Sequence, residues 1–309
     1  MRFASQTSRT DSVSEVVHPA STGASVASVI DELASKLHKK VTDPRRLAAD
    51  IIAALLEVPR SWPSMNRDAS LDSDTVAAAI KAAGKLGKGA PFAYAVGSAC
   101  FRHLNLIVDE RVLIPRPETE VLVGEVLERC KATGRSSWGI AVDIGTGSGA
   151  IALSLAAEGK FDRVIAIDAS LDALAVAREN ESRSAQALNA GVDFRHGSLL
   201  APLNGETVDV IVSNPPYVAF SEAESLPSSV RDWEPPLALF SGHDGMRATA
   251  EIVRNSARHI ASGGLLALEV DERRASLVAE MVMGHGAYTN VGVRLDLAGR
   301  ERFVFASRL

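Results

Sequence analysis

The sequence predicts an α/β protein in which a mostly parallel β-sheet follows a smaller helical domain. From residue 139 to the C-terminus, apolar runs of strand length alternate with helical patterns. Such alternation is typical of a parallel sheet with helices on both faces. A glycine-rich segment joins the first of these strands to a helix, and residues 26–90 are Ala-rich with helical periodicity only. These three observations define the predicted fold class.

The composition is that of an ordinary globular protein of about two domains. The chain has 309 residues, 46% of them hydrophobic and 23% charged, which is more than one small domain needs. A net charge of −5 argues against a general polyanion binder, so we expect no direct nucleic-acid contact. The two cysteines, Cys100 and Cys130, have neither metal-ligand nor disulfide-framework spacing. No apolar run approaches the ~18 residues that span a bilayer. We therefore expect a cytoplasmic protein with no membrane segment and no metal site.

The N-terminal part is expected to consist of a disordered tail, residues 1–25, and a helical domain, residues 26–90. The tail is rich in Ser, Thr and Ala and has no periodicity. Asp43 and Pro44 predict the start of the second helix, because Asp caps helices and Pro is favoured at their first position. A third helix is expected over 70–85. The first helix should bury the residues that recur at three- and four-residue steps: Ile30, Leu33, Leu37 and Val41.

Residues 91–117 are predicted to form a hairpin linker that turns near Asp109 and Glu110, since apolar and polar residues alternate on both sides. Residues 118–309 then form the sheet domain, beginning with a helix over 118–129. The expected strands are 139–144, 163–168, 193–195, 208–213, 265–270, 291–297 and 302–306, with further helices at 150–158, 171–183 and 249–260.

The strand that ends at Ile144 runs directly into a glycine loop, which consists of Gly145, Thr146, Gly147, Ser148 and Gly149. Glycines allow a sharp turn and a close approach to a ligand, and the N-terminus of the following helix offers N–H groups to an anion. Asp168 ends the next strand, where a carboxylate accepts hydrogen bonds from ribose hydroxyls. Together these features predict a nucleotide-type cofactor. The Gly-x-Gly-x-Gly spacing favours S-adenosylmethionine over NAD.

Asp143 precedes the glycine loop, and its role stays open between two interpretations. It either caps the end of its strand or receives the ammonium group of the cofactor, directly or through water.

The strand over 208–213 is followed by a rigid polar segment, Asn214, Pro215, Pro216 and Tyr217. Each Pro fixes its own φ near about −65° and lacks a donor, and it keeps the preceding residue out of the helical region. The Asn side chain supplies one acceptor and two donors, and the Tyr ring a flat wall. The segment therefore predicts a pocket for one planar, hydrogen-bonding group. A simple Pro-Pro strand end is the alternative, which the glycine loop upstream disfavours.

In this order, the motifs resemble a Rossmann-like, S-adenosylmethionine-dependent methyltransferase that modifies planar amino or amide nitrogens. More narrowly, the chain is similar to the HemK-type N5-glutamine methyltransferases of peptide chain release factors, from about Asp43 to the C-terminus. The most specific segment reads Val-Leu-Ile-Pro-Arg-Pro-Glu-Thr-Glu, because amine-directed DNA methyltransferases share the Asn-Pro-Pro-Tyr type of motif but not this run. The resemblance is carried by residues 112–120, 143–151, 213–218, 234–239 and 296–300.

The resemblance implies a seven-stranded methyltransferase domain whose last strand is antiparallel, preceded by a small helical domain and a β-hairpin linker. It also implies the reaction: a methyl group passes from S-adenosylmethionine to the glutamine amide of a Gly-Gly-Gln motif in a release factor, the partner of a monomeric enzyme. The implied cofactor-binding residues are Gly145, Thr146, Gly147, Ser148, Gly149, Asp168, Leu199 and Asn214. The implied substrate slot is Asn214, Pro215, Pro216 and Tyr217.

An amide nitrogen is a poor nucleophile because its lone pair is delocalised into the carbonyl group. We expect the Asn214 side-chain oxygen and the Pro215 carbonyl each to accept one N–H of the glutamine amide, in line with the methyl group. Such orientation contributes up to ~7–11 kcal/mol in intramolecular systems, and each preorganised acceptor ~2.7–4 kcal/mol by analogy with oxyanion holes. Tyr217 is expected to shape the slot. No general base is required, since the methylated amide loses its proton to water.

The chain departs from the family pattern at three places, none of which belongs to the transfer chemistry. Ser198-Leu199 replaces an acid and an apolar residue beside the adenine, so only Leu199, which can pack on the ring, has a counterpart. Phe92-Ala93-Tyr94 replaces Gln-Tyr, and Val270-Asp271-Glu272 replaces a glycine-containing turn. Arg116 and Glu118 are expected to act together as a structural or partner-contact pair near the pocket mouth.

Three other functions are disfavoured by the sequence. An amine-directed DNA or RNA methyltransferase would use the same slot for a flipped base, but the acidic net charge disfavours it. A non-catalytic cofactor-binding protein is disfavoured by the intact motifs. An NAD-dependent dehydrogenase lacks an acid or base for hydride transfer.

Overall fold

The computed structural model describes residues 23–38 and 41–309, so most of the predicted tail lies outside the described residues. The chain divides into two compact units between Ile80 and Lys81, and each is described by itself. This division falls within helix α4 (Ser73–Leu86), ten residues before the expected boundary at 90/91. No helix among the described residues is long and apolar enough to cross a membrane.

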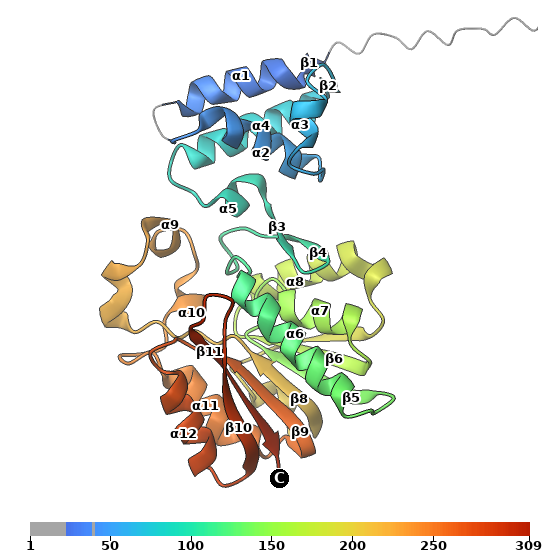
Figure 1. The fold of residues 1–309 in the computed structure, drawn as a ribbon, viewed down its shortest axis with the longest axis vertical. Helices are drawn as coiled ribbons and strands as arrows, with labels where there is room; N and C mark the ends of the chain where they lie inside the picture. The colour runs from blue at the N-terminus through green and yellow to red at the C-terminus, as the bar shows by residue number, and fades with distance from the viewer. Residues whose placement is uncertain (1–22, 39–40) are drawn as a thin grey trace, which may run out of the picture. The chain divides into compact units, whose positions relative to one another are not determined.

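The first unit is helical and runs from blue to cyan in Figure 1. It contains α1 (Val26–Leu37), α2 (Pro44–Leu55), α3 (Trp62–Met65) and the start of α4. Asp43 caps α2 as predicted, since its carboxylate accepts the Arg46 N–H at 3.1 Å. Two predictions are wrong here. Ala24 and Ser25 belong to strand β1 (Ala24–Ser25), which pairs with β2 (Ser70–Leu71), and Val41 lies beyond the end of α1.

The second unit begins with α5 (Phe92–Val96) and a hairpin of β3 (Ser98–Phe101) and β4 (Leu104–Ile107). The hairpin lies in the predicted linker, but its turn is at Arg102 and His103 rather than at Asp109 and Glu110, because Phe101 pairs with Leu104. Arg102 adopts a φ of 51°, as tight two-residue hairpin turns require. The Asp109 carboxylate instead accepts the Arg111 N–H at 3.0 Å.

A seven-stranded sheet forms the centre of the second unit and has the order β10-β11-β9-β8-β5-β6-β7. Only the last strand in sequence, β11, is antiparallel to its neighbours, so the predicted Rossmann-like fold is confirmed. The strands are β5 (Trp138–Ile144), β6 (Phe161–Asp168), β7 (Gly191–His196), β8 (Val208–Ser213), β9 (Ile260–Glu269), β10 (Tyr288–Leu295) and β11 (Glu301–Arg308).

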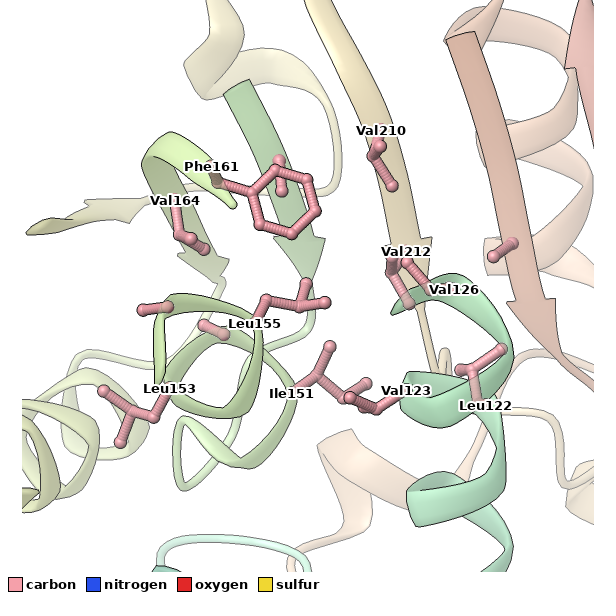
Figure 2. Close-up of a cluster of buried hydrophobic side chains, with 14 of the residues drawn as sticks. Leu122, Val123, Val126, Ile151, Leu153, Leu155, Phe161, Val164, Val210 and Val212 are labelled. Carbon is pink, nitrogen blue, oxygen red and sulfur yellow. The ribbon is translucent and has the colours of Figure 1, made fainter. Parts of the chain in front are cut away.

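Helices cover both faces of this sheet (Figure 1). On one face α6 (Pro117–Ala132) and α7 (Ala150–Glu158) pack against alternate strand residues, and Figure 2 shows Val210 and Val212 of β8 among them. The intervening Ile211 belongs to the core on the other face, with α11 (Arg247–Ser256) and α12 (Ala275–Gly284). Burial on both faces explains why the central strands read as continuous apolar runs. The sequence did not predict α12.

Two further segments position the site. Helix α8 (Leu171–Ser184) follows β6, close to the hairpin strand β4. Between β8 and β9 the chain makes a long excursion through η3 (Phe220–Ser225), α9 (Ser228–Arg231) and α10 (Pro236–Leu239) before it reaches α11.

Candidate functional site

Four residues of the candidate site lie in a row at the carboxyl ends of neighbouring parallel strands. Ile144 of β5 pairs with Ser213 of β8 and with Ile167 of β6, and Ser213 pairs with Leu268 of β9. The next residue of each strand is therefore at the same level of the sheet. In the sheet order these residues are Glu269, Asn214, Gly145 and Asp168. Ligands bind at this edge in open α/β sheets.

The glycine loop turns sharply from β5 into α7. Gly145, Gly147 and Gly149 have φ angles of 74°, 54° and 84°, in the left-handed region that glycine adopts without strain. A Cβ on Gly149 would lie 3.1 Å from the Leu153 side chain, so this glycine permits the close packing of the helix. Gly145 and Gly147 line a pocket and have open space where a Cβ would stand.

Asp143 is a buried residue that holds the glycine loop in place through hydrogen bonds. Its carboxylate is fully buried, and Oδ2 accepts the Thr146 hydroxyl at 2.6 Å and the Ala152 N–H at 3.1 Å. Oδ1 has no hydrogen-bond partner among the described residues. Burial raises the pKa of this carboxyl to about 7. The structure therefore shows a carboxylate that organises the glycine loop, and a role towards the ammonium group of the cofactor stays a prediction.

Asp168 lies at the end of β6 and closes the loop on its other side. Oδ2 accepts the Gly147 N–H and Oδ1 the Ser170 N–H, both at 2.9 Å. Each carboxylate oxygen has a second lone pair, so both can still accept a hydroxyl. Burial raises the pKa of Asp168, although the two backbone N–H groups oppose this shift. The arrangement suits the two hydroxyls of a ribose.

The pocket beside these residues has a volume of about 390 Å³, within the range of small-molecule sites. It is lined by Gly145, Gly147, Asp168, Leu199 and Asn214 from the predicted set. Leu199 has a φ of 49°, which is rare for a residue with a side chain and occurs preferentially at functional sites. The sequence did not single out Glu251 of α11, which also lines the pocket.

Five of the predicted site residues are outside the lining of this pocket: Thr146, Ser148, Gly149, Pro215 and Tyr217. Thr146 and Ser148 are buried and stabilise the loop itself. The Thr146 hydroxyl donates to Asp143, and the Ser148 carbonyl accepts the side-chain N–H of Asn180. Pro216 lines the pocket. Within the described part of the chain, His, Cys, Asp and Glu side chains form no group of three or more that could hold a metal ion.

The Asn-Pro-Pro-Tyr segment follows β8 directly and is partly buried. The Asn214 side chain donates through Nδ2 to the Thr119 hydroxyl at 3.1 Å, which leaves its oxygen, Oδ1, as an acceptor. Pro215 is buried, and no donor among the described residues is bonded to its carbonyl. Burial raises the pKa of Tyr217 to about 12, so its phenol stays protonated at neutral pH.

Thr119 and Glu269 support Asn214 from behind, and sequence reasoning missed both roles. The Thr119 hydroxyl contacts Oε2 of Glu269 at 2.7 Å, and the two residues are 4% and 1% exposed. Thr119 lies in the first turn of α6, which Pro117 begins at its first position. The useful signal in the sequence is Glu269, an acidic residue that ends an otherwise apolar strand.

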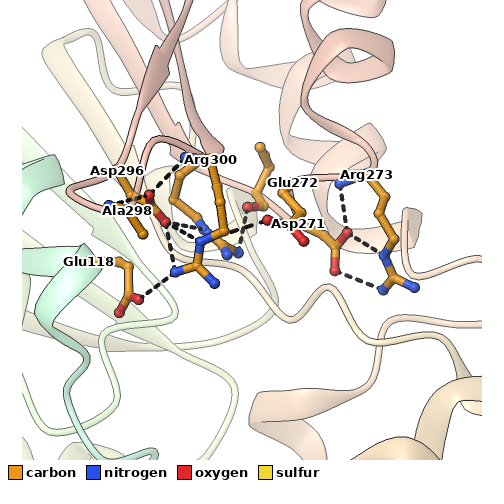
Figure 3. Close-up of polar contacts among 9 residues, drawn as sticks. Glu118, Asp271, Glu272, Arg273, Asp296, Ala298 and Arg300 are labelled. Atoms are coloured by element: carbon orange, nitrogen blue, oxygen red, sulfur yellow. Dashed lines mark hydrogen bonds and ion pairs between the residues drawn. The ribbon is translucent and has the colours of Figure 1, made fainter.

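The predicted partnership of Arg116 with Glu118 is wrong, because each binds a different segment. Arg116 contacts both carboxylate oxygens of Glu234, at 2.6 and 2.7 Å. Glu118 contacts Arg300 at 3.1 Å, and Arg300 is held by Asp296 (Figure 3). The two ion pairs attach the start of α6 to the excursion after β8 and to the turn after β10. Three of the five segments that carry the family resemblance therefore meet here.

Asn180 and Tyr94 anchor the linker to the site, and no pattern in the sequence indicates this role for Asn180. Its buried side chain donates to the carbonyls of Ile107 (3.0 Å) and Ser148 (2.9 Å) and accepts the Ile107 N–H at 2.7 Å. The buried Tyr94 hydroxyl donates to the carbonyl of Val112, which lines the pocket. The glycine loop and the pocket wall are thus fastened to the hairpin region.

Fold and site together define an α/β methyltransferase. The methyltransferase small domain family matches residues 119–226. Among solved structures, the hMettl16 catalytic domain superposes with a TM-score of 0.51 over 77% of this chain and 82% of that chain, at 14% identity. This likeness concerns the fold alone.

The chain belongs to the release factor glutamine methyltransferase family. It is 44% identical to the release factor glutamine methyltransferase of Moorella thermoacetica, over 71% of this chain and 76% of that protein. It is 33% identical to the protein of the same name from Bacillus cereus, over 83% of this chain and 90% of that protein. The family predicted from the motifs is confirmed.

Proposed function

We propose that the chain transfers a methyl group from S-adenosylmethionine to the side-chain amide nitrogen (N5) of the glutamine in the Gly-Gly-Gln motif of peptide chain release factors. The observation that carries this proposal is the free acceptor of Asn214 beside the glycine loop. It is fixed by a hydrogen bond to Thr119 and lies in the same row of strand ends as Gly145 and Asp168.

The residues around the pocket fit S-adenosylmethionine. Asp168 has an acceptor left on each oxygen for the ribose hydroxyls, and Leu199 offers an apolar surface to the adenine. The backbone of Gly145 and Gly147 leaves room for the methionyl part, whose carboxylate suits the N-terminus of α7. The unpartnered Oδ1 of Asp143 suits its ammonium group. When bound, S-adenosylmethionine supplies an electrophilic methyl group attached to a positively charged sulfur.

The protein's contribution to the transfer is orientation of the glutamine amide. Asn214 Oδ1 and the Pro215 carbonyl each accept one N–H, which holds the nitrogen in one place and stabilises the positive charge that develops on it. Preorganised acceptors of this kind contribute ~2.7–4 kcal/mol each. Tyr217 forms a wall of the slot as a neutral phenol, and Pro216 keeps that wall rigid because its φ is fixed.

A protein substrate explains the remaining features better than a nucleic acid. The net charge is −5, which opposes a polyanion, and the relatives carry the release-factor name. The predicted helical domain, residues 26–90, and the hairpin linker, residues 91–117, are proposed to contribute to binding the release factor. We propose that the enzyme acts as a monomer in the cytoplasm, where translation factors occur.

The test is mass spectrometry of a purified release factor after incubation with the enzyme and S-adenosylmethionine. Methylation mapped to the Gly-Gly-Gln glutamine is the expected result. A release factor in which this glutamine is replaced by Glu serves as control. Methyl transfer to DNA or RNA but not to the release factor would instead support an amine-directed nucleic-acid methyltransferase, and cofactor binding without any turnover would support a non-catalytic protein.

A further inference from the structure

We propose that Glu269, acting through the hydroxyl of Thr119, is a positioning residue that fixes which end of the Asn214 amide faces the substrate. The inference rests on the proposed function, in which Asn214 Oδ1 accepts the glutamine N–H. It adds the two hydrogen bonds that keep this oxygen in place, from Thr119 to Glu269 and from Asn214 to Thr119.

An asparagine amide has a donor and an acceptor end of nearly the same shape, so packing alone holds its orientation weakly. In this site the orientation follows from hydrogen-bond polarity. An ionised Glu269 can only accept, so the Thr119 hydroxyl donates to it at 2.7 Å. The oxygen of Thr119 is then left as an acceptor for Asn214 Nδ2 at 3.1 Å. Asn214 Oδ1 must consequently point away from Thr119.

The relay is sheltered from water. Glu269 is 1% exposed and Thr119 4% exposed, and they come from β9 and from the first turn of α6. Because the hydrogen bonds lie in a low-dielectric interior, an unpaired donor or acceptor here is costly. The donor-to-acceptor direction of the two hydrogen bonds is therefore strongly favoured.

Protonation of Glu269 would reverse this polarity. A neutral carboxyl can donate to Thr119, whose hydroxyl hydrogen is then free to face Asn214 and to favour the flipped amide. Burial raises the pKa of Glu269 to about 7. Arg302 of β11 and Arg116 favour the charged form, whereas Glu118 disfavours it, and Tyr217, which follows β8, is close enough to be affected by its charge. The productive orientation therefore dominates above about pH 7 and is lost as the pH falls.

The first test compares two substitutions of Thr119. Thr119→Val keeps the shape but removes the hydroxyl, so we expect kcat to fall about tenfold, which corresponds to about 1.4 kcal/mol, with the dissociation constant of S-adenosylmethionine within about twofold of wild type. Thr119→Ser restores the hydroxyl and should recover most of the loss. Thr249→Val is the matched control, since Thr249 is equally buried but lies outside the pocket and should leave kcat unchanged.

The second test does not depend on turnover. In ¹⁵N-labelled protein without ligands, the side-chain amide resonances of Asn214 should shift with a midpoint near pH 7 in wild type. In Glu269→Gln, which cannot ionise, this transition should be absent, and the acid limb of kcat should disappear with it.

Three results would overturn the relay: wild-type kcat in Thr119→Val, equal loss in the Val and Ser variants, or an unchanged Asn214 titration in Glu269→Gln. Failure of the proposed function has a different signature. In that case the wild-type protein does not methylate the release factor, while the Asn214 titration still tests the relay.

Discussion

The ion pair between Arg116 and Glu234 offers a quantitative test of how the substrate slot is assembled. Glu234 is 1% exposed and Arg116 29% exposed at the side chain, and one guanidinium nitrogen contacts both carboxylate oxygens. Removal of one partner from a buried pair costs about 3–5 kcal/mol, because the other charge stays buried alone. Since Arg116 is partly exposed and solvent screens it, we expect about 3 kcal/mol for Arg116→Met.

The loss of unfolding free energy in Arg116→Met depends on pH. Burial raises the pKa of Glu234, and Arg116 opposes this shift, so the pKa rises further once the arginine is gone. A group with a raised pKa in the folded state favours folding while it is protonated and loses this contribution as the pH rises through that pKa. Glu234 in Arg116→Met therefore takes up a proton on acidification. The penalty should shrink by up to about 1.4 kcal/mol per pH unit.

Urea denaturation of wild type, Arg116→Met, Glu234→Gln and the double variant at about pH 8 and about pH 5 measures both effects. At the higher pH, Arg116→Met should lower the free energy of unfolding by about 3 kcal/mol, and the double variant should recover much of the loss. Arg231→Met is the control, because Arg231 pairs with Asp232 at the surface. Additive single and double variants, or a penalty that grows on acidification, would refute the argument.

Three further predictions concern the site. Asn214→Ala should lower kcat about 10²–10³-fold, while isothermal titration calorimetry should find a nearly unchanged affinity for S-adenosylmethionine. Equal losses of kcat and affinity would contradict the role of Asn214. Asn255→Ala on α11 is the control. Asp168→Asn should weaken S-adenosylmethionine binding at least about tenfold, because hydrogen bonds to a charged acceptor contribute about 1.5–3 kcal/mol each, whereas kcat at saturating cofactor should change little; unchanged affinity would remove Asp168 from the ribose site. Asn180→Ala breaks three hydrogen bonds and should cost about 3 kcal/mol of unfolding free energy, and an unchanged denaturation midpoint would show that the hairpin is anchored by other contacts.

The ends of the central strands β5, β6 and β8 were predictable from the sequence, because a glycine or a polar residue stands where each apolar run stops. The last two strands end at Leu295 and Arg308 rather than at 297 and 306. β8 ends at Ser213 and is followed at once by Asn214, and β5 runs into Gly145, as the local pattern requires. In parallel sheets these ends share one edge, so their meeting follows from the fold class. The turn of the hairpin was mispredicted for the opposite reason. Alternation across Asp109 looked like a strand pair, whereas a left-handed Arg102, which no glycine marked, makes the turn.

The partners of the site residues were not predictable, because they depend on where separate elements dock. Arg116 precedes α6 and Glu118 lies in its first turn, two residues further on, and this proximity in the sequence suggested a shared role. In the structure the first finds Glu234, 118 residues away, and the second finds Arg300, 182 residues away. No local pattern in the sequence predicts partners that lie so far away along the chain. The packing of α6 on the sheet sets them, and that packing is a property of the whole core.

Three buried carboxylates near the strand ends have different roles, because the docking of separate elements gives each of them different hydrogen-bonding partners. Asp143 accepts a hydroxyl and an N–H from the loop that follows it, so it shapes the loop. Asp168 accepts two backbone N–H groups and lines the pocket, so its remaining lone pairs face a ligand. Glu269 accepts the hydroxyl of Thr119, a group that can both donate and accept, so the charge of Glu269 determines the orientation of the next group, Asn214. The residue type fixes none of these roles; the hydrogen-bonding partner does, and for Glu269 that partner makes the site sensitive to pH.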